Sequence, residues 1–223
     1  MTTNTAVGAL EVLFRRLGLL MALAAGISLL PGVAAVTRPT GRTVGRPEQV
    51  FSPVRMALIA LGWFVAAVVL WRPLPVHLGT RTRAGLLVPA VAAYVMGLGL
   101  AMAGRIALGA AYRPTSTVGV RLAPGQALVT SGPYALVRHP MYVGIVLAAL
   151  GALGLYRTWT TLLFIAQLPV LYVRARREDE ALEAEFGAAW RRYHNSVPAW
   201  LPRPGGCQRR ARDPGSGSDR LKS

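Results

Sequence analysis

Residues 137–186 read VRHPMYVGIVLAALGALGLYRTWTTLLFIAQLPVLYVRARREDEALEAEF. This stretch contains two apolar runs, 141–156 and 158–173, which are separated by the single residue Arg157. So short a connection predicts a tight hairpin of two antiparallel helices, which returns the chain to the side that it left. The hairpin therefore predicts that the acidic segment beginning at Glu178 lies on the same side as His139.

Acidic residues are scarce outside that segment. No Asp or Glu occurs between residues 49 and 177, whereas five of the nine acidic residues fall between 178 and 185. A carboxylate at the centre of a bilayer costs about 2.5 kcal/mol or more, so a long stretch without acids is expected of a chain in lipid. The single acidic cluster requires an explanation of its own.

The composition excludes an ordinary soluble domain. Of the 223 residues, 53% are hydrophobic and only 15% are charged, against roughly 25% in soluble domains. The 25 Lys and Arg residues face 9 Asp and Glu residues, but nucleic-acid-binding modules are not this apolar, and we expect no nucleic-acid partner. The only cysteine, Cys207, excludes an internal disulfide and a cysteine-built zinc site, and we expect no metal.

Five apolar runs are predicted to be transmembrane helices: 17–36, 56–71, 84–104, 141–156 and 158–173. With five spans, 19 Lys and Arg residues lie on the side of the 105–139 loop and the C-terminal tail, and 6 lie on the other side. The positive-inside rule then predicts that the 105–139 loop and the tail are cytoplasmic and that the N-terminus is outside. The first run could instead be a signal peptide, since Arg15 and Arg16 precede it and small residues near Ala34 could form a cleavage region.

Three parts follow from this division: an N-terminal three-helix membrane region (1–104), a core with the connecting segment, the hairpin and the acidic helix (105–202), and a disordered basic tail (203–223). The tail is rich in Pro, Gly, Ser and Arg. Its arginines are expected to lie against anionic lipid headgroups.

Two groups of polar residues are candidates for a functional site. Pro140 suits the first turn of a helix, which places His139 beside free backbone N–H groups that favour an anion. Arg174 and Glu178 are four residues apart and share a helix face. Taken separately, Arg138 and His139 are typical of a membrane interface, and the acidic run is typical of a solvated helix face. The predicted hairpin brings the two together, which favours a site.

These residues carry a family resemblance. Ser131-Gly132-Pro133-Tyr134, then Val137-Arg138-His139-Pro140-Met141-Tyr142-x-Gly144, then the acidic pair and Phe186-Gly187, Tyr193, Val197-Pro198 and Leu201-Pro202 resemble the isoprenylcysteine carboxyl methyltransferase family and its phospholipid methyltransferase relatives. The resemblance covers about residues 113–203. The chain departs from the family in having Asp179 where a second glutamate is usual, and Trp190 where a tyrosine is common.

The five apolar runs predict an all-α integral membrane fold with five transmembrane helices, and the resemblance implies a cytoplasmic cofactor-binding cap formed by the 105–139 segment and the C-terminal helix. It implies S-adenosylmethionine as cofactor and a lipophilic or prenylated acceptor that enters from the bilayer. Arg174 resembles the arginine that holds the acceptor. The positions that resemble the family's cofactor site are Gln126, Ala127, Leu128, Val129, Tyr134, His139, Pro140, Met141, Tyr142 and Glu178.

The chemistry suits these residues. A cofactor with a sulfonium, an ammonium and a carboxylate requires an anion, N–H donors and aromatic walls, which Glu178, the helix start at His139, and Tyr134 with Tyr142 supply. A carboxylate acceptor requires no general base, whereas an amine or thiol acceptor would require one, for which His139 is the candidate. The open alternatives are an NADPH-dependent membrane reductase of the steroid-reductase type, a phospholipid N-methyltransferase and a non-catalytic membrane scaffold.

Overall fold

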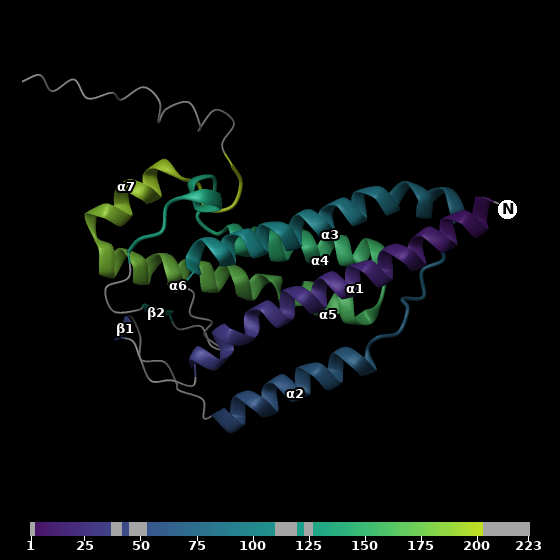
Figure 1. Cartoon of the computed structure of the whole chain (residues 1–223), viewed down its shortest axis with the longest axis horizontal. Coiled ribbons are helices and arrows are strands. Elements are labelled where there is room, and N and C mark those ends of the chain that lie inside the picture. Colours follow the sequence, from purple (N-terminus) through teal and green to yellow (C-terminus); the bar gives the residue numbers. More distant parts are fainter. Residues whose placement is uncertain (1–2, 37–41, 45–52, 110–119, 123–126, 203–223) are drawn as a thin grey trace, which may run out of the picture.

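The computed structural model describes residues 3–36, 42–44, 53–109, 120–122 and 127–202 (Figure 1). The described part is almost entirely helical, as predicted. The helices are α1 (Thr3–Val36), α2 (Pro53–Val69), α3 (Thr80–Leu108), the 3-10 helix η2 (Gly132–Ala135), α4 (Pro140–Tyr156), α5 (Trp159–Ala166), α6 (Leu168–Phe186) and α7 (Ala188–Ser196). One departure from a purely helical fold is a short antiparallel pair of strands, β1 (Arg42–Val44) and β2 (Val120–Leu122).

The closest helix packing is between α3 and α4, and small residues permit it. A Cβ atom added at Gly97 would lie 2.3 Å from the backbone nitrogen of Ala148, and one added at Gly144 would lie 2.5 Å from that of Ala101. A Cβ atom at Gly151 would lie 2.4 Å from the backbone nitrogen of Tyr94. Glycines that allow two backbones to approach so closely are typical of helix packing in membranes. Gly97, Gly144 and Gly151 therefore serve the close packing of α3 against α4.

The predicted hairpin is present. α4 ends at Arg157, whose left-handed backbone (φ 52°, ψ 52°) reverses the chain, and Thr158 caps α5 through its hydroxyl, which accepts from the backbone N–H of Thr161. The segment after α2 pairs with this turn, since the N–H of Leu74 donates to the carbonyl of Arg157 at 2.8 Å.

The expectation of one continuous helix over 158–173 is wrong. The chain forms α5 and then α6, with Gln167 between them. Pro169 explains the break, because proline has no N–H for the ladder and its ring clashes with the preceding turn, whereas it is tolerated in the first turn of a new helix. α6 then runs from the apolar end of the hairpin through the acidic residues without interruption.

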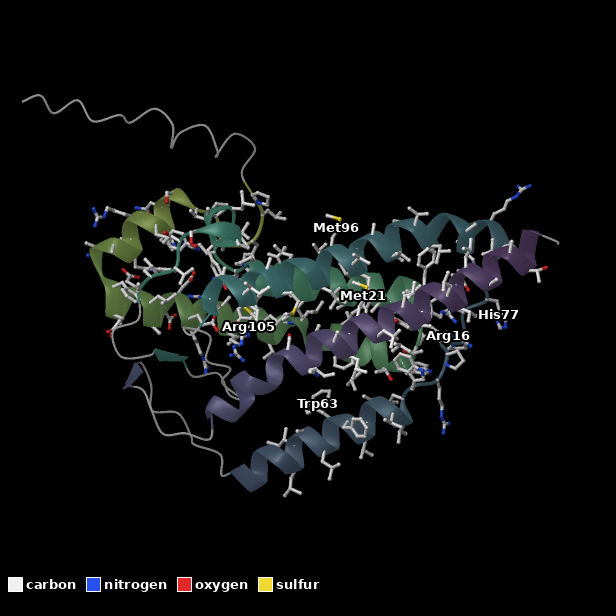
Figure 2. All side chains as sticks on the ribbon, viewed as in Figure 1. Arg16, Met21, Trp63, His77, Met96 and Arg105 are labelled. Atoms are coloured by element: carbon white, nitrogen blue, oxygen red, sulfur yellow. The ribbon has the colours of Figure 1, made fainter. Side chains whose placement is uncertain are left out.

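Within the described residues, α3 is the one helix that is both long and apolar enough to cross a membrane, and Leu58–Val69 and Pro140–Tyr156 are shorter apolar helices. Large apolar side chains on the outside of the bundle are exposed, among them Phe64, Val88 and Ile106, and Met96 projects outward in Figure 2. Such a surface is expected of helices that contact lipid.

The two ends of the bundle differ. Figure 1 shows the N-terminus of α1 at one end and α7 at the other. Arg16 and His77 lie at the N-terminal end in Figure 2. The hairpin turn at Arg157 contacts Glu11 near the start of α1, so the turn belongs to the N-terminal end as well. The beginning of α4 and the acidic part of α6 lie at the opposite end.

Candidate functional site

The beginning of α4 brings His139 into a buried position. His139 is the residue before α4, Pro140 opens the helix, and the His139 carbonyl accepts from the N–H of Val143 at 3.0 Å. The residue is 6% exposed. The predicted placement at the helix start is correct, because it follows from the local fit of proline to a first turn.

The acidic residues of α6 reach this histidine. His139 Nε2 lies 3.0 Å from Asp179 Oδ1, and His139 Nδ1 lies 4.0 Å from Glu178 Oε2. The Tyr142 hydroxyl donates to Glu178 Oε1, and Arg174 Nε approaches the same oxygen at 3.3 Å. The two sequence constellations therefore form one cluster, which we call the His139 cluster: His139, Tyr142, Arg174, Glu178 and Asp179.

Two buried polar atoms of this cluster lack an aligned hydrogen bond. Although His139 Nε2 and Asp179 Oδ1 are close, they are not aligned for a hydrogen bond, and neither atom has another partner in the described part of the chain. A buried polar group left without a partner costs about 1–3 kcal/mol. The cluster therefore has unused hydrogen-bonding capacity for a polar ligand.

Arg138 is not the exposed interfacial charge that it resembles in the sequence. Its side chain is 8% exposed, and its Nη2 lies 3.3 Å from Asp179 Oδ2. Its guanidinium lies over the ring of Trp190, with 5.7 Å between the carbon Cζ and the ring centre. Arg138 thus connects the start of α4 to α6 and α7, and Asp179, shorter than the usual glutamate, is its partner.

The segment after α7 covers His139. The N–H groups of Arg138 and His139 donate to the carbonyls of Pro198 and Ala199 at 2.8 and 3.1 Å. These bonds place the Trp200 ring 5.7 Å from the His139 ring, and Trp200 also neighbours Tyr142 and Tyr172. His139 and Tyr142 are stacked, with 5.7 Å between ring centres. The site therefore has an aromatic wall made by residues from three segments.

Sequence reasoning missed Trp200, Tyr172 and the role of Arg138. An amphipathic tryptophan two residues after Pro198 was a signal, but nothing local shows which ring it would meet. Tyr193 was part of the motif, and its hydroxyl donates to the carbonyl of Tyr134 at 2.7 Å, which ties α7 to η2.

The remaining predicted cofactor positions differ in their burial and in the segment that carries them. Pro140 is fully buried at the start of α4, and the Met141 side chain faces Gly104 of α3. Ala127 is exposed, and Leu128 and Val129 are half-buried in the segment that leads to η2. Gln126 lies outside the described residues.

Electrostatics keep Arg174 charged. Burial disfavours its charge, but its interactions with Tyr142 and Glu178 outweigh burial and raise the pKa of Arg174 above its ordinary value. Burial also raises the pKa of the Tyr193 hydroxyl to about 12, so this group donates its hydrogen bond at neutral pH.

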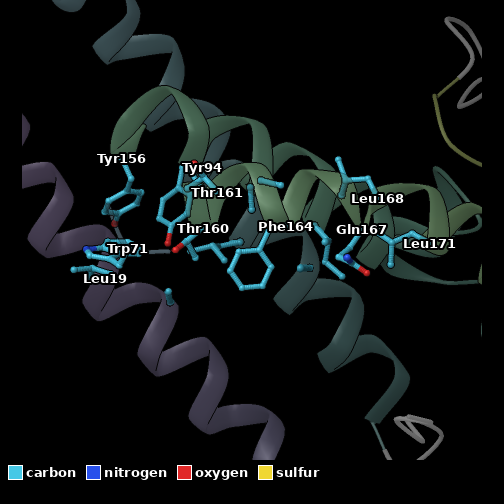
Figure 3. Close-up of a pocket in the computed structure, with 17 residues that line it drawn as sticks. Leu19, Trp71, Tyr94, Tyr156, Thr160, Thr161, Phe164, Gln167, Leu168 and Leu171 are labelled. Atoms are coloured by element: carbon cyan, nitrogen blue, oxygen red, sulfur yellow. The ribbon is translucent and has the colours of Figure 1, made fainter. Parts of the chain in front are cut away.

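An apolar cavity lies between the helices. It has a volume of about 400 Å³ and is lined mainly by apolar side chains (Figure 3). One end is formed by Trp71, Tyr94 and Tyr156, and the other by Leu168 and Leu171 of α6. Because Leu171 is one helical turn before Arg174, the second end points along α6 toward the His139 cluster.

The comparisons with known proteins concern this half of the chain. Residues 90–184 match the model of the isoprenylcysteine carboxyl methyltransferase family. A stretch of 77 residues is 40% identical to the protein-S-isoprenylcysteine O-methyltransferase of Schizosaccharomyces pombe, and it covers 34% of this chain and 33% of that protein. The match begins within α3, where Gly97 and Gly104 form part of the packing surface for α4. The resemblance to the isoprenylcysteine carboxyl methyltransferase family, expected from the motifs around His139 and Glu178, is therefore confirmed over residues 90–184.

Proposed function

We propose that this chain is an integral membrane S-adenosylmethionine-dependent methyltransferase, which transfers a methyl group to the carboxylate of an isoprenylcysteine or a similar lipid-like acid. One observation carries the proposal. The Arg-His-Pro-x-Tyr motif and the acidic helix, which are distant in sequence, meet in the His139 cluster inside the segment that matches the family.

The residues present suit the cofactor. Glu178 is partly exposed and offers an anion for the ammonium group, and the rings of Tyr142 and Trp200 offer flat apolar surfaces. His139 Nε2 and Asp179 Oδ1, which lie 3.0 Å apart without an aligned hydrogen bond, offer further polar groups. The residues that we assign to cofactor binding are Gln126, Ala127, Leu128, Val129, Tyr134, His139, Pro140, Met141, Tyr142 and Glu178.

The proposed reaction is a direct displacement. The cofactor, held by these residues, would supply an activated methyl group: its carbon–sulfur bond would break as an acceptor carboxylate oxygen bonds to the methyl carbon, with the electron pair left on sulfur. No proton moves, so no general base is required. The protein's contribution is then to hold the acceptor and to exclude water, and positioning of this kind is worth up to roughly 7–11 kcal/mol.

Arg174 is the residue that we assign to the acceptor carboxylate. It is the cation of the cluster nearest to the end of the apolar cavity, and its raised pKa keeps it charged. In the structure the Arg174 Nε lies 3.3 Å from Glu178 Oε1, which orients its guanidinium within the His139 cluster. The apolar cavity suits the hydrocarbon part of such an acceptor, because its lining is mainly apolar.

The proposed topology has five transmembrane spans, with the His139 cluster facing the cytoplasm under a cap formed by the 105–139 segment and the C-terminal helix. We propose the same three parts as the sequence predicts: 1–104, 105–202 and 203–223. In support, Arg15, Arg83 and Arg157, which the five-span arrangement assigns to one side, all lie near Glu11. The pairing of β1 with β2 likewise joins two loops assigned to the other side.

A binding experiment tests the proposal. Labelled S-adenosylmethionine is titrated into the purified full chain in detergent, and into the variants Glu178→Gln and His139→Ala. We expect each variant to weaken binding by about tenfold or more, because each removes a polar partner from a partly buried site. Glu183→Gln is the matched control, since Glu183 is on the same helix but is 51% exposed.

Unchanged binding in both site variants would refute the cofactor assignment. Binding of NADPH instead of S-adenosylmethionine would favour the membrane reductase. If S-adenosylmethionine binds, methyl transfer to a farnesylated cysteine derivative and to phosphatidylethanolamine is compared. Transfer to the amine alone would favour the phospholipid N-methyltransferase, and its rate should then depend on His139.

A further inference from the structure

A second charged cluster lies at the end of the bundle opposite to the His139 cluster. Arg15 of α1, Arg83 of α3 and Arg157 of the hairpin turn surround the carboxylate of Glu11. We call these four residues the arginine cluster. We propose that the arginine cluster binds the phosphate group of an anionic phospholipid, a site that is independent of the proposed methyl transfer.

The Glu11 carboxylate accepts hydrogen bonds from two of the three arginines. Arg83 donates to both oxygens of Glu11, with 3.2 Å between its Nε and Oε1, and Arg157 Nη2 donates to Oε1 at 3.0 Å. Arg15 is farther away, with 3.8 Å between its Nη2 and Oε2. Its Nε donates instead to the carbonyl of Leu155 at 2.8 Å. Glu11 is 3% exposed, so its capacity as an acceptor is used within the cluster.

The charge of the cluster is not balanced. Three guanidinium groups face one carboxylate, which leaves an excess of two positive charges. The side chains of Arg15, Arg83 and Arg157 are 34%, 28% and 18% exposed, so the excess charge is only partly hydrated. A guanidinium carries five N–H donors. The contacts above engage two nitrogen atoms of Arg15 and of Arg83, and Arg157 Nη1 also donates to the carbonyl of Gly154 at 3.0 Å. A phosphate oxygen is the ligand that arginine donors match best in charge and geometry.

The surroundings favour a lipid phosphate over free phosphate. The Tyr156 hydroxyl donates to the carbonyl of Arg15 at 2.9 Å, and the Tyr94 hydroxyl donates to that of Gly18 at 3.0 Å. Tyr94 and Tyr156 also line one end of the apolar cavity. A positively charged cluster that adjoins an apolar surface suits an amphiphile with a phosphate head, and basic pockets between membrane helices bind such headgroups.

The test uses the full chain purified in a nonionic detergent, with bound lipid counted by native mass spectrometry during titration. Phosphatidylglycerol is the anionic probe and phosphatidylcholine the zwitterionic one. We expect Arg15→Gln to weaken phosphatidylglycerol binding roughly three- to tenfold, which is the range for one partly exposed charged contact. Arg81→Gln is the matched control. Arg81 is exposed near the start of the helix that also carries Arg83, and its substitution removes the same charge as Arg15→Gln.

Glu11→Gln gives a prediction of opposite sign. Removal of the only carboxylate raises the excess charge from two to three, so phosphatidylglycerol should bind more tightly than to the unaltered protein. Equal effects of Arg15→Gln and Arg81→Gln would overturn the proposal, because they would show attraction to general surface charge. Equal binding of the two lipids would also overturn it, and displacement of phosphatidylglycerol by an equal concentration of inorganic phosphate would assign the cluster to free phosphate.

Discussion

The packing of α3 against α4 gives the sharpest prediction, because α3 contains two glycines that differ only in their surroundings. A Cβ atom at Gly97 would lie 2.3 Å from the backbone nitrogen of Ala148, whereas one at Gly99 would meet nothing within 4 Å. An ordinary contact begins at 3.4 Å, so α3 and α4 would have to separate by about 1 Å to accept Gly97→Ala.

The magnitude follows from two terms. Replacing a helical glycine by alanine stabilises a helix by about 0.5–1 kcal/mol, and this term is common to Gly97→Ala and Gly99→Ala. Overpacking against a backbone costs about 1–3 kcal/mol, and this term applies at Gly97 alone. The difference in unfolding free energy between the two variants therefore isolates the packing term, about 1–3 kcal/mol.

The assay is equilibrium unfolding of both variants in mixed detergent micelles, together with cofactor binding. Because His139 directly precedes α4, a separation of about 1 Å should also weaken cofactor binding in Gly97→Ala, and displacements of that size cost up to about a hundredfold in a positioned site. Gly99→Ala should bind as well as the unaltered protein. Equal stability of the two variants would refute the close approach of α3 and α4.

Three further predictions concern the end of the bundle that carries the His139 cluster. Arg138→Gln should lower the unfolding free energy by about 1–3 kcal/mol, as measured by denaturant titration, because it leaves Asp179 without its buried cation. Arg191→Gln, which removes an exposed cation, should change it by less than about 0.5 kcal/mol. Tyr193→Phe should cost about 0.5–1.5 kcal/mol through the lost bond to Tyr134, and it should also change the alkaline limb of stability. Since the pKa of Tyr193 in the folded protein is raised to about 12, its contribution to stability is fully present below about pH 10 and is lost as the pH rises toward 12. The loss of unfolding free energy between about pH 10 and 12 should therefore be smaller in Tyr193→Phe. An equal loss in both proteins would contradict the raised pKa. Trp200→Leu should weaken cofactor binding while Leu201→Ala, at an exposed neighbour, should not, and equal binding by the two variants in the titration described above would argue against an aromatic wall.

Features that depend on neighbours in sequence were predictable. His139 lies at a helix start because Pro140 fits a first turn, and Arg174 meets Glu178 because four residues make about one helical turn. The one-residue gap at Arg157 predicted the hairpin. The break at Gln167 was also predictable in principle from Pro169, but the continuous apolar run concealed it.

Features that depend on distant contacts were not predictable in the same way. In the sequence, Glu11 is an isolated acid and Arg138 is an interfacial cation. Only the folded chain brings Glu11 to Arg83 and Arg157, and Arg138 to Asp179. A charged side chain carries no local signal of which partner it will meet, because that depends on how the helices pack.

The amino-acid sequence alone determined the helical character of this protein, the apolar hairpin and the side on which its acidic helix emerges. These features follow from the hydrophobic runs, their spacing and the absence of carboxylates within them. Such signals depend on residues within one or two helical turns of each other, or on how each segment partitions between lipid and water. The tertiary structure decided which charges pair, which ring covers His139 and where the cavity lies. Those outcomes depend on glycines that let α3 and α4 approach and on contacts between residues more than 100 positions apart, such as Glu11 and Arg157.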